Sequence, residues 1–386
     1  MLKLAELGII PKELLYIKNK SSPICVSCAF GTAHKKQTKN KRGRHHEIRT
    51  KTDDAPGKCV SMDQLISTQP GLIPQFWGHL TRDRIWAANV AVDHFTNVIK
   101  VALMKTTSQA ETLDAKLATE KFFKDHGYDI ERWHADNGRY AEVDFRDAVK
   151  EQDQSIKYCG VGAHHQNGIV EAAIKRLTLR ARTLLLHAKR YWPEAITTMF
   201  WPYALLAACD AHNNWSVDEN GKTPMMKLLN LTIFPEMKFE HTFGCPVYIL
   251  DSKLQSSGLG PPKWEPRSRL GIYLGKSPYH AGSVALVLNP KTGHVSPQYH
   301  VVFDDDFTTV PYLSNNTENP DVPSHWQALC ESSTECSTHE SYDLNETWFH
   351  KELETQVVKA TDSVSKGTFK PKNIVAQNVC TDTTME

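Results

Sequence analysis

Residues 165–189 read HQNGIVEAAIKRLTLRARTLLLHAK, and the pattern in this stretch predicts one long helix from about Gly168 to Lys189. Apolar side chains recur at steps of three or four, which gives a helix one apolar face for packing. They are Val170, Ile174, Leu177, Ala181, Leu184 and Ala188. A second row with the same spacing is mostly charged and comprises Glu171, Lys175, Thr178 and Arg182. The sequence therefore predicts a helix that packs by one face and carries a charged row on another.

Residues 53–215 alternate between strand and helix patterns, which is typical of an α/β domain. Strands are predicted at 58–65, 86–92, 98–104, 130–134 and 155–159, and further helices at 108–126, 143–152 and 193–212. Ser108 followed by Glu111 has the spacing of a capping box, and Pro193 suits the first turn of a helix. Short β-rich runs at 247–250, 269–274, 283–288 and 299–303 then predict a small antiparallel β domain over residues 216–310.

The charge of the chain is unevenly distributed. The 386 residues, enough for two or three domains, carry a net charge of +1, but residues 311–386 carry −7 and residues 1–310 carry +8. A basic body favours a polyanionic partner, and the polar, acidic segment 311–386 is predicted to be a disordered tail. The nine scattered cysteines do not suggest a disulfide framework and favour a reducing compartment. No signal peptide and no membrane-spanning run is recognised, so we expect no membrane partner.

Three carboxylates stand at positions suited to a shared site. Asp63 lies within the first predicted strand, Asp136 follows the strand at 130–134, and Glu171 opens the long helix. Each of these residues alone is more often a turn or capping residue, or one half of an ordinary Glu–Lys surface pair. Together, three carboxylates meet the need of two divalent cations held about 3.5–4 Å apart, which stabilise the attacking and leaving oxygens in phosphodiester chemistry. The pattern predicts a Mg²⁺ or Mn²⁺ site.

These residues resemble the DDE integrase core of LTR retrotransposons and retroviruses, and they match copia-type elements most closely. The resemblance covers roughly residues 1–310. It rests on the three carboxylates and on a set of specific segments. These are HQNGIVE (165–171), GKTP (221–224), FGCP (243–246), PRSRLGIYLG (266–275) and LNPKTGHVSPQYHVVFDDDF (288–307). The segments after residue 220 are the most specific to copia-type polyproteins, whereas wider groups of transposases share the three carboxylates.

The resemblance implies an RNase H-like fold, with a mixed five-stranded sheet flanked by helices. It implies an enzyme that processes DNA 3′ ends and transfers strands, with Asp63, Asp136 and Glu171 as catalytic metal ligands. It also implies two binding partners, double-stranded DNA and a second copy of the chain. The implied location is the nucleus, which the protein reaches from a cytoplasmic particle. The expected DNA contacts are Gln166, Asn167, Lys175 and Arg182, together with Lys41, Arg42 and Arg44 in a basic run at 33–51 that also suits nuclear import. The sequence departs from the family pattern at two points. The spacing from Asp136 to Glu171 is one residue shorter than usual, and Ala172 stands where many relatives carry a basic residue.

Cys25 and Cys28 match half of the zinc-binding module that the resemblance implies over residues 1–52. In that module two histidines precede the cysteine pair, and a structural zinc site needs four ligands. No histidine precedes Cys25, so the simplest interpretation is that this chain begins inside the module. The alternatives are that His34, His45 or His46 substitutes as a Zn²⁺ ligand, or that the two thiols bind no metal.

Three functions remain open from the sequence. The first is a DDE-type integrase that joins DNA, and the second is an RNase H-like nuclease that cuts but does not join. The third is a catalytically decayed or domesticated DNA-binding remnant of a retrotransposon polyprotein. The incomplete zinc module favours the third, whereas the retained carboxylates favour the first.

Overall fold

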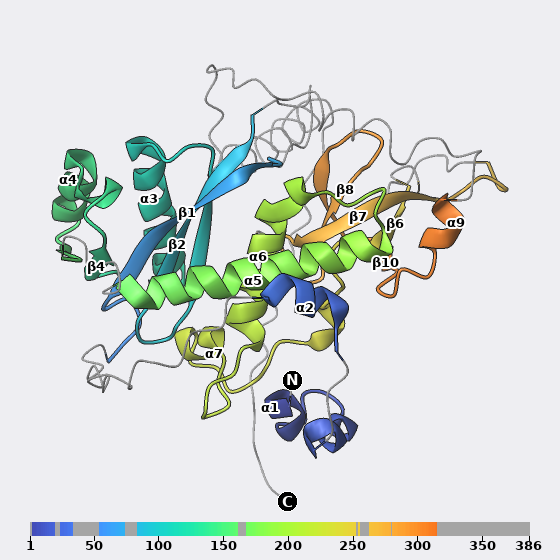
Figure 1. The fold of residues 1–386 in the computed structure, drawn as a ribbon, viewed down its shortest axis with the longest axis horizontal. Helices are drawn as coiled ribbons and strands as arrows, with labels where there is room; N and C mark the ends of the chain where they lie inside the picture. Colours follow the sequence, from blue (N-terminus) through green and yellow to red (C-terminus); the bar gives the residue numbers. More distant parts are fainter. Residues whose placement is uncertain are drawn as a thin grey trace, which may run out of the picture. The chain divides into compact units, whose positions relative to one another are not determined.

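The computed structural model describes residues 2–19, 24–33, 54–73, 83–160, 167–251, 254, 262–278 and 280–314. Its first sheet has five strands in the order β3-β2-β1-β4-β5 (Figure 1). They are β1 (Val60–Gly71), β2 (Ile85–Asp93), β3 (Ile99–Met104), β4 (Arg132–Ala135) and β5 (Ser155–Tyr158). The first three strands pair antiparallel, while β4 and β5 run parallel to β1. This mixed five-stranded sheet with flanking helices confirms the predicted fold class.

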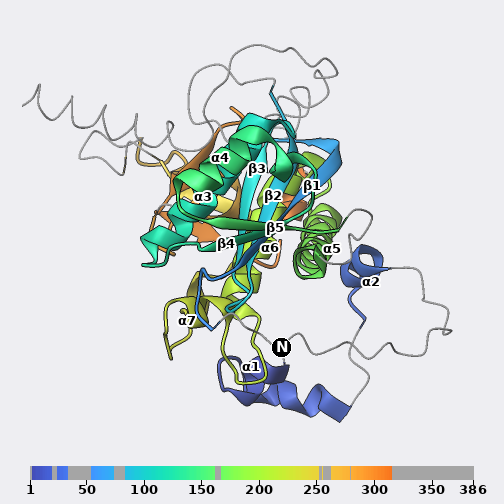
Figure 2. The ribbon, with the colours of Figure 1, turned by 90° about the vertical axis from the view of Figure 1, so that its left-hand side faces the viewer.

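Helices cover both faces of this sheet (Figure 2). On one face α3 (Gln109–Asp125) and α4 (Val143–Glu151) bury Phe123 and Phe145 against Val60 and Met62 of β1. On the other face α5 (Gly168–Tyr191) and α6 (Trp201–Trp215) pack against β2, where Val90 belongs to their apolar cluster. This division follows from the strand geometry, because successive side chains point to opposite faces.

A second sheet is antiparallel throughout and has the strand order β10-β6-β7-β8-β9. The strands are β6 (Pro246–Leu250), β7 (Ser268–Lys276), β8 (Ala285–Leu288), β9 (Val295–Gln298) and β10 (Val301–Phe303). Its buried side chains, among them Val247 and Ile272, belong to the same apolar cluster as Leu177 and Tyr203 of the long helices. This sheet therefore shares a core with α5 and α6.

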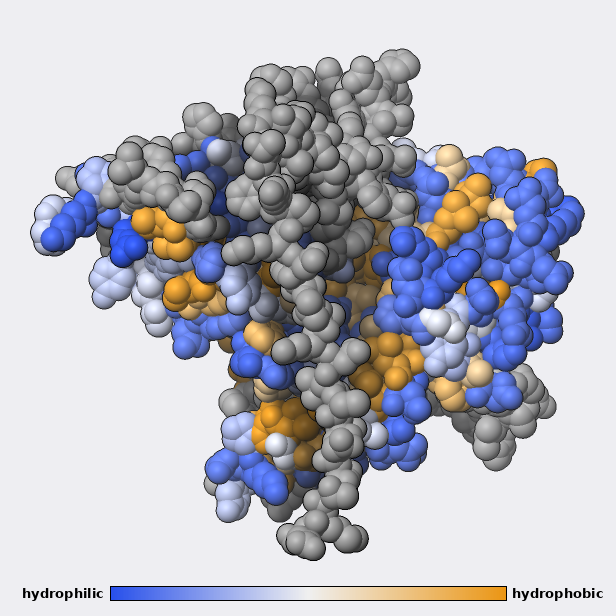
Figure 3. Space-filling view, turned by 180° about the vertical axis from the view of Figure 1, so that it is seen from behind, coloured by the Kyte–Doolittle hydropathy of each residue, from blue (hydrophilic) through white to orange (hydrophobic). Residues whose placement is uncertain are grey.

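The N-terminal segments contain short helices. They are α1 (Leu2–Glu6), η1 (Lys12–Asn19) and α2 (Val26–Thr32), and α2 packs along α5 (Figure 1). The remaining short elements are η2 (Arg139–Ala141), η4 (Thr198–Phe200), α7 (Pro224–Leu228), η5 (Met237–Phe239) and α9 (Val310–Ser314). None of the helices in the described segments is long and apolar enough to span a bilayer. Figure 3, seen from behind Figure 1, shows hydrophobic residues in patches beside hydrophilic areas.

Several predicted boundaries are wrong. The helix expected to begin at Pro193 begins at Trp201, because η4 comes first and the hydroxyl of Thr197 accepts a hydrogen bond from the Met199 amide. Pro202 takes the favourable first-turn position. Strand β1 continues to Gly71, six residues beyond the predicted end. Helix α9 extends to Ser314, so the predicted disordered tail is wrong at 311–314, and its remainder, 315–386, lies outside the described residues.

Candidate active site

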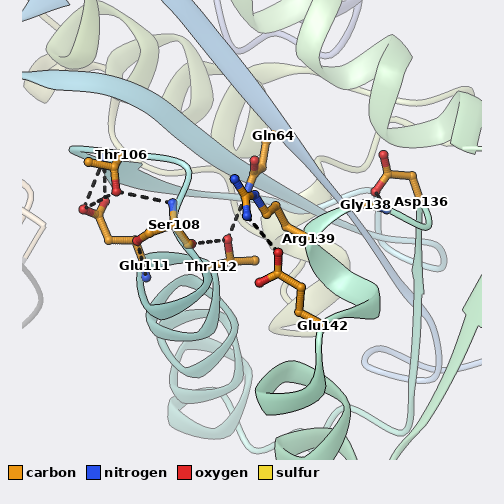
Figure 4. A network of polar contacts seen from close by, with 9 residues as sticks. All are labelled: Gln64, Thr106, Ser108, Glu111, Thr112, Asp136, Gly138, Arg139 and Glu142. Atoms are coloured by element: carbon orange, nitrogen blue, oxygen red, sulfur yellow. Dashed lines mark hydrogen bonds and ion pairs between the residues drawn. The ribbon is translucent and has the colours of Figure 1, made fainter.

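Asp63 lies near the start of β1, within the strand as predicted. It is half-buried, and its Oδ1 accepts a hydrogen bond of 2.8 Å from the Gln64 amide. Its partner on β2 is Val90, which belongs to the apolar cluster of α5, so Asp63 is on the α5 face. Gln64 turns the other way and donates to Thr112 of α3 over 2.8 Å (Figure 4). The strand that carries Asp63 is thus held from both faces.

Asp136 follows directly after β4 and is also half-buried. Its Oδ1 accepts a hydrogen bond of 3.1 Å from the Gly138 amide, and Figure 4 shows the two residues side by side in the turn. A Cβ at Gly138 would lie 3.2 Å from that oxygen, so glycine permits the tight turn. Asn137 anchors the turn by donating from Nδ2 to the Cys159 carbonyl over 2.8 Å. Local contacts therefore fix the direction of the Asp136 carboxylate.

The pairing of β1 with β4 relates the two aspartates. In this parallel pair Val60 lies opposite Trp133 and Ser61 lies opposite His134. The same offset carried two residues further matches Asp63 with Asp136. Because side chains on one face of a strand recur every second residue, Asp63 continues the row of Ser61. Asp136 follows His134 by two residues and lies directly beyond β4. Two of the three predicted ligands therefore belong to neighbouring strands, one within β1 and one just after β4.

Both aspartates also act on one buried phenol. Tyr140 is 1% exposed, and its hydroxyl accepts a hydrogen bond of 2.8 Å from Asn89 of β2. Burial raises the pKa of Tyr140 well above its usual value, and the negative charges of Asp63 and Asp136 raise that pKa further. The Tyr140 phenol therefore stays protonated at neutral pH.

Glu171 lies in the first turn of α5 and is exposed. Among the residues that the structure describes, no group of three or more His, Cys, Asp or Glu side chains is close enough to hold a metal ion. Asp63 thus lies within β1 and Asp136 just after the adjacent strand β4, whereas Glu171 does not complete a coordination sphere with them. The donor chemistry nevertheless fits, because all three are carboxylates, the ligands that Mg²⁺ and Mn²⁺ prefer.

The other predicted DNA contacts have different surroundings. Lys175 is exposed and has no hydrogen bond or ion pair within the described segments. Arg182 instead donates from Nη1 to the carbonyl of Gly31 on α2, over 3.3 Å. Asn167 is buried against β1 and β4. The remaining predicted contacts, Gln166, Lys41, Arg42 and Arg44, lie outside the described residues.

Cys25 and Cys28 are exposed at the start of α2. The sulfur of Cys25 caps this helix by accepting from the Cys28 amide at 3.4 Å, and this hydrogen bond lowers the pKa of the Cys25 thiol. Within the described segments no third ligand joins the two cysteines. The alternative zinc ligands His34, His45 and His46 lie outside those segments. No disulfide links the six cysteines at the described positions.

Two polar residues beside the carboxylates did not stand out in the sequence. Ser61 precedes Asp63 by two residues, and His134 precedes Asp136 by two residues. Their Oγ and Nδ1 atoms are 3.4 Å apart, and Ser61 Oγ is 2.8 Å from Nε2 of His94. The period of two along each strand is a signal that places both residues on the face of the aspartates.

Comparison with known proteins identifies no matching family model and no matching curated protein. Among solved structures, the HTLV-2 integrase catalytic core domain in complex with magnesium aligns with 45% of this chain and 97% of its own length, at 16% identity and a TM-score of 0.33. The BIV integrase catalytic core domain aligns with 45% of this chain and 95% of its own length, at the same identity and TM-score. A chain of the simian T-cell lymphotropic virus intasome in complex with PP2A regulatory subunit B56 gamma aligns with 78% of this chain and 97% of its own length. Its identity is 16% and its TM-score is 0.35.

Proposed function

We propose that this chain is the integrase segment of a copia-type LTR retrotransposon polyprotein. It processes the 3′ ends of the element's DNA and joins them to target DNA in a reaction that requires Mg²⁺ or Mn²⁺. The observation that supports this best is the parallel pairing of β1 with β4, in which Ser61 and His134, each two residues before an aspartate, lie opposite each other. The copia-type segments after residue 220 support the choice of family.

Asp63, Asp136 and Glu171 would hold the divalent cations. When bound, such cations stabilise the attacking and leaving oxygens of an in-line displacement at phosphorus. Like charges repel, so bringing Glu171 to the two aspartates requires a positive counter-charge among them. The chain's part is to hold two carboxylates at fixed positions on the sheet and to present the third on the first turn of α5.

Lys175 is the best-placed DNA contact on α5. It follows Glu171 by four residues, so both side chains lie on the same side of the helix, and it is exposed. A lysine ammonium with no partner among the described residues is available for a phosphate of the DNA backbone. We further propose that the basic run at 33–51 binds DNA. The chain would act as an oligomer with a second copy of itself, in the nucleus.

A decayed DNA-binding remnant is the second candidate. The exposed position of Glu171, outside any three-ligand group in the described segments, favours it. In that case the chain binds DNA without joining it, and the three carboxylates have no catalytic role. The two candidates differ in one measurable product, the joined DNA.

The test is strand transfer by the full chain, with oligonucleotides that match the termini of the element and with Mg²⁺ or Mn²⁺ present. Joined product is expected from the wild-type chain and should be lost in Asp63→Asn, because the amide removes a negative ligand. Asp147→Asn is a matched control, since Asp147 is an exposed residue of α4 whose ion pair is with Lys150. This control should join DNA as the wild type does.

DNA binding separates the two candidates further. Asp63→Asn should still bind DNA, because the carboxylate acts on the reaction and not on the phosphate backbone. Joining by Asp63→Asn at the wild-type rate would exclude Asp63 as a ligand. DNA binding without joined product in the wild-type chain, with either metal, would favour the remnant.

A further inference from the structure

Asn167, the residue immediately before α5, bonds two different strands through one buried side chain. The residue is 3% exposed. Its Nδ2 donates to the carbonyl oxygen of Met62 on β1 over 3.1 Å, and its Oδ1 lies 3.2 Å from Nδ1 of His134 on β4. One amide therefore joins the start of α5 to both strands that lead to the aspartates.

The chemistry of the partners fixes the direction of these bonds. The Met62 carbonyl can only accept, so the amide nitrogen of Asn167 must face it. The amide oxygen then faces His134 and can only accept, so Nδ1 of His134 carries the hydrogen. Ser61 Oγ, 3.4 Å from the same Nδ1, can accept from it in turn and donate to Nε2 of His94 at 2.8 Å. The network therefore runs from His94, just after β2, through β1 and β4 to the start of α5.

Asn167 makes these contacts in place of its usual local role. It is the N-cap residue of α5, where asparagine is among the most favourable residues because its side chain can bond the exposed amides of the first turn. Here the side chain makes no capping hydrogen bond. The Asn167 amide thus bonds two strands instead of capping its own helix. This indicates that the side chain fixes the position of the helix start relative to those strands.

We propose that Asn167 is a positioning residue that sets where α5, and with it Glu171, lies relative to Asp63 and Asp136. This proposal deepens the function proposed above and rests on it. Met62 is one residue before Asp63, and His134 is two residues before Asp136. Glu171 is four residues after Asn167, about one helical turn. The Asn167 side chain thus connects β1, β4 and the start of α5, each within a few residues of one of the three carboxylates.

A buried side chain with this role affects the reaction step more than the binding of DNA. In the full chain, Asn167→Ala should lower kcat for strand transfer by about 10- to 100-fold, because misplacing a reacting group by about 1 Å has an effect of that order. The KM for DNA should change by less than about twofold, since catalytic geometry and ground-state binding are separate. Asn167→Asp should do no better, because its carboxylate keeps an acceptor for His134 but offers Met62 no donor.

Asn213 provides a matched control at β3, the edge strand of the same sheet. This residue of α6 also bridges a helix to a strand, since its Oδ1 accepts from the Ile99 amide over 2.9 Å and its Nδ2 donates to the Ile99 carbonyl over 2.8 Å. Asn213→Ala therefore removes a similar pair of bonds. It should lower thermal stability about as much as Asn167→Ala does, yet leave kcat unchanged.

Three outcomes would overturn the proposal. A raised KM with unchanged kcat would make Asn167 a DNA contact. Equal losses of kcat in Asn167→Ala and Asn213→Ala would make its role merely structural. Hydrogen exchange gives a readout without activity, because the helix-bonded amides of residues 172–175 at the start of α5 should exchange faster in Asn167→Ala but not in Asn213→Ala. Unchanged exchange would reject the positioning role, whereas faster exchange in a chain that joins no DNA would reject the proposed function alone.

Discussion

Ser61 on β1 and His134 on β4 lie opposite each other in parallel register, with Oγ and Nδ1 3.4 Å apart. Each residue precedes a candidate metal ligand by two positions, Asp63 in one strand and Asp136 beyond the other. Because side chains alternate along a strand, Asp63 lies on the face of this pair, and Asp136 follows directly beyond β4. The pairing of two strands therefore positions Asp63 relative to Asp136. The position of Glu171 depends on α5.

Lys175 and Arg182 should differ in their effect on DNA binding. Lys175→Gln removes an exposed ammonium with no partner in the described segments, so DNA affinity should fall and the salt dependence of log K should lose about one unit of slope. Arg182→Gln removes a bond to the Gly31 carbonyl and should mainly loosen α2. Fluorescence anisotropy at several salt concentrations measures both. An equal loss of slope in Arg182→Gln would show that Arg182 also contacts phosphate.

Close packing of α2 on α5 depends on Gly31. A Cβ at this position would lie 2.3 Å from Oγ1 of Thr183 and 3.1 Å from its Cα. Gly31→Ala should therefore lower the free energy of unfolding by about 1–3 kcal/mol, as overpacking does in a well-packed interface. Urea unfolding measures this. Thr183→Ala added to Gly31→Ala should restore part of the loss, and Gly282→Ala, with nothing within 4 Å, should have little effect.

His212 should make stability depend on pH. Its side chain is buried, and burial, followed by the charges of Arg176 and Arg180, lowers its pKa from 6.5 to about 4, although the bond to the Asn97 carbonyl opposes this shift. The folded chain thus keeps His212 neutral where the unfolded chain protonates it. The free energy of unfolding should fall as pH drops from about 6.5 towards about 4, by at most about 1.4 kcal/mol per pH unit.

Urea unfolding between pH 7 and pH 5 measures this contribution. His212→Gln should flatten the dependence, because an amide can donate to Asn97 and accept from Arg176 without taking a proton. The exposed His300 provides a control, and His300→Gln should leave the slope unchanged. An unchanged slope in His212→Gln would mean that other groups cause the pH dependence.

The sequence predicted elements best where one pattern dominates. The helix expected at 168–189 is α5, from Gly168 to Tyr191, because its apolar face is continuous. Strand β9 was missed because Pro297 lies within it, yet a proline is tolerated there since β9 is at the edge of its sheet. Ser108 caps α3 as predicted, but the Glu111 carboxylate bonds Thr106, so the capping box is only half formed.

The candidate site was predictable as residue types and not as contacts. Strand and helix patterns placed Asp63, Asp136 and Glu171 on three separate elements, but pairing register is a long-range property that no local pattern contains. Arg182 shows the limit most clearly. Its spacing suits a DNA contact, yet α2, more than 140 residues earlier in the chain, supplies its carbonyl partner. Distant segments decide which polar side chains remain exposed.

The central claim is that Asp63, Asp136 and Glu171 share divalent cations. Anomalous scattering from crystals of the full chain grown with Mn²⁺ tests this most directly. We expect a Mn²⁺ peak within bonding distance of carboxylate oxygens of both aspartates, with Glu171 drawn to the same cluster, and its loss in Asp63→Asn. Mn²⁺ bound only elsewhere, or a peak unchanged by Asp63→Asn, would contradict the account.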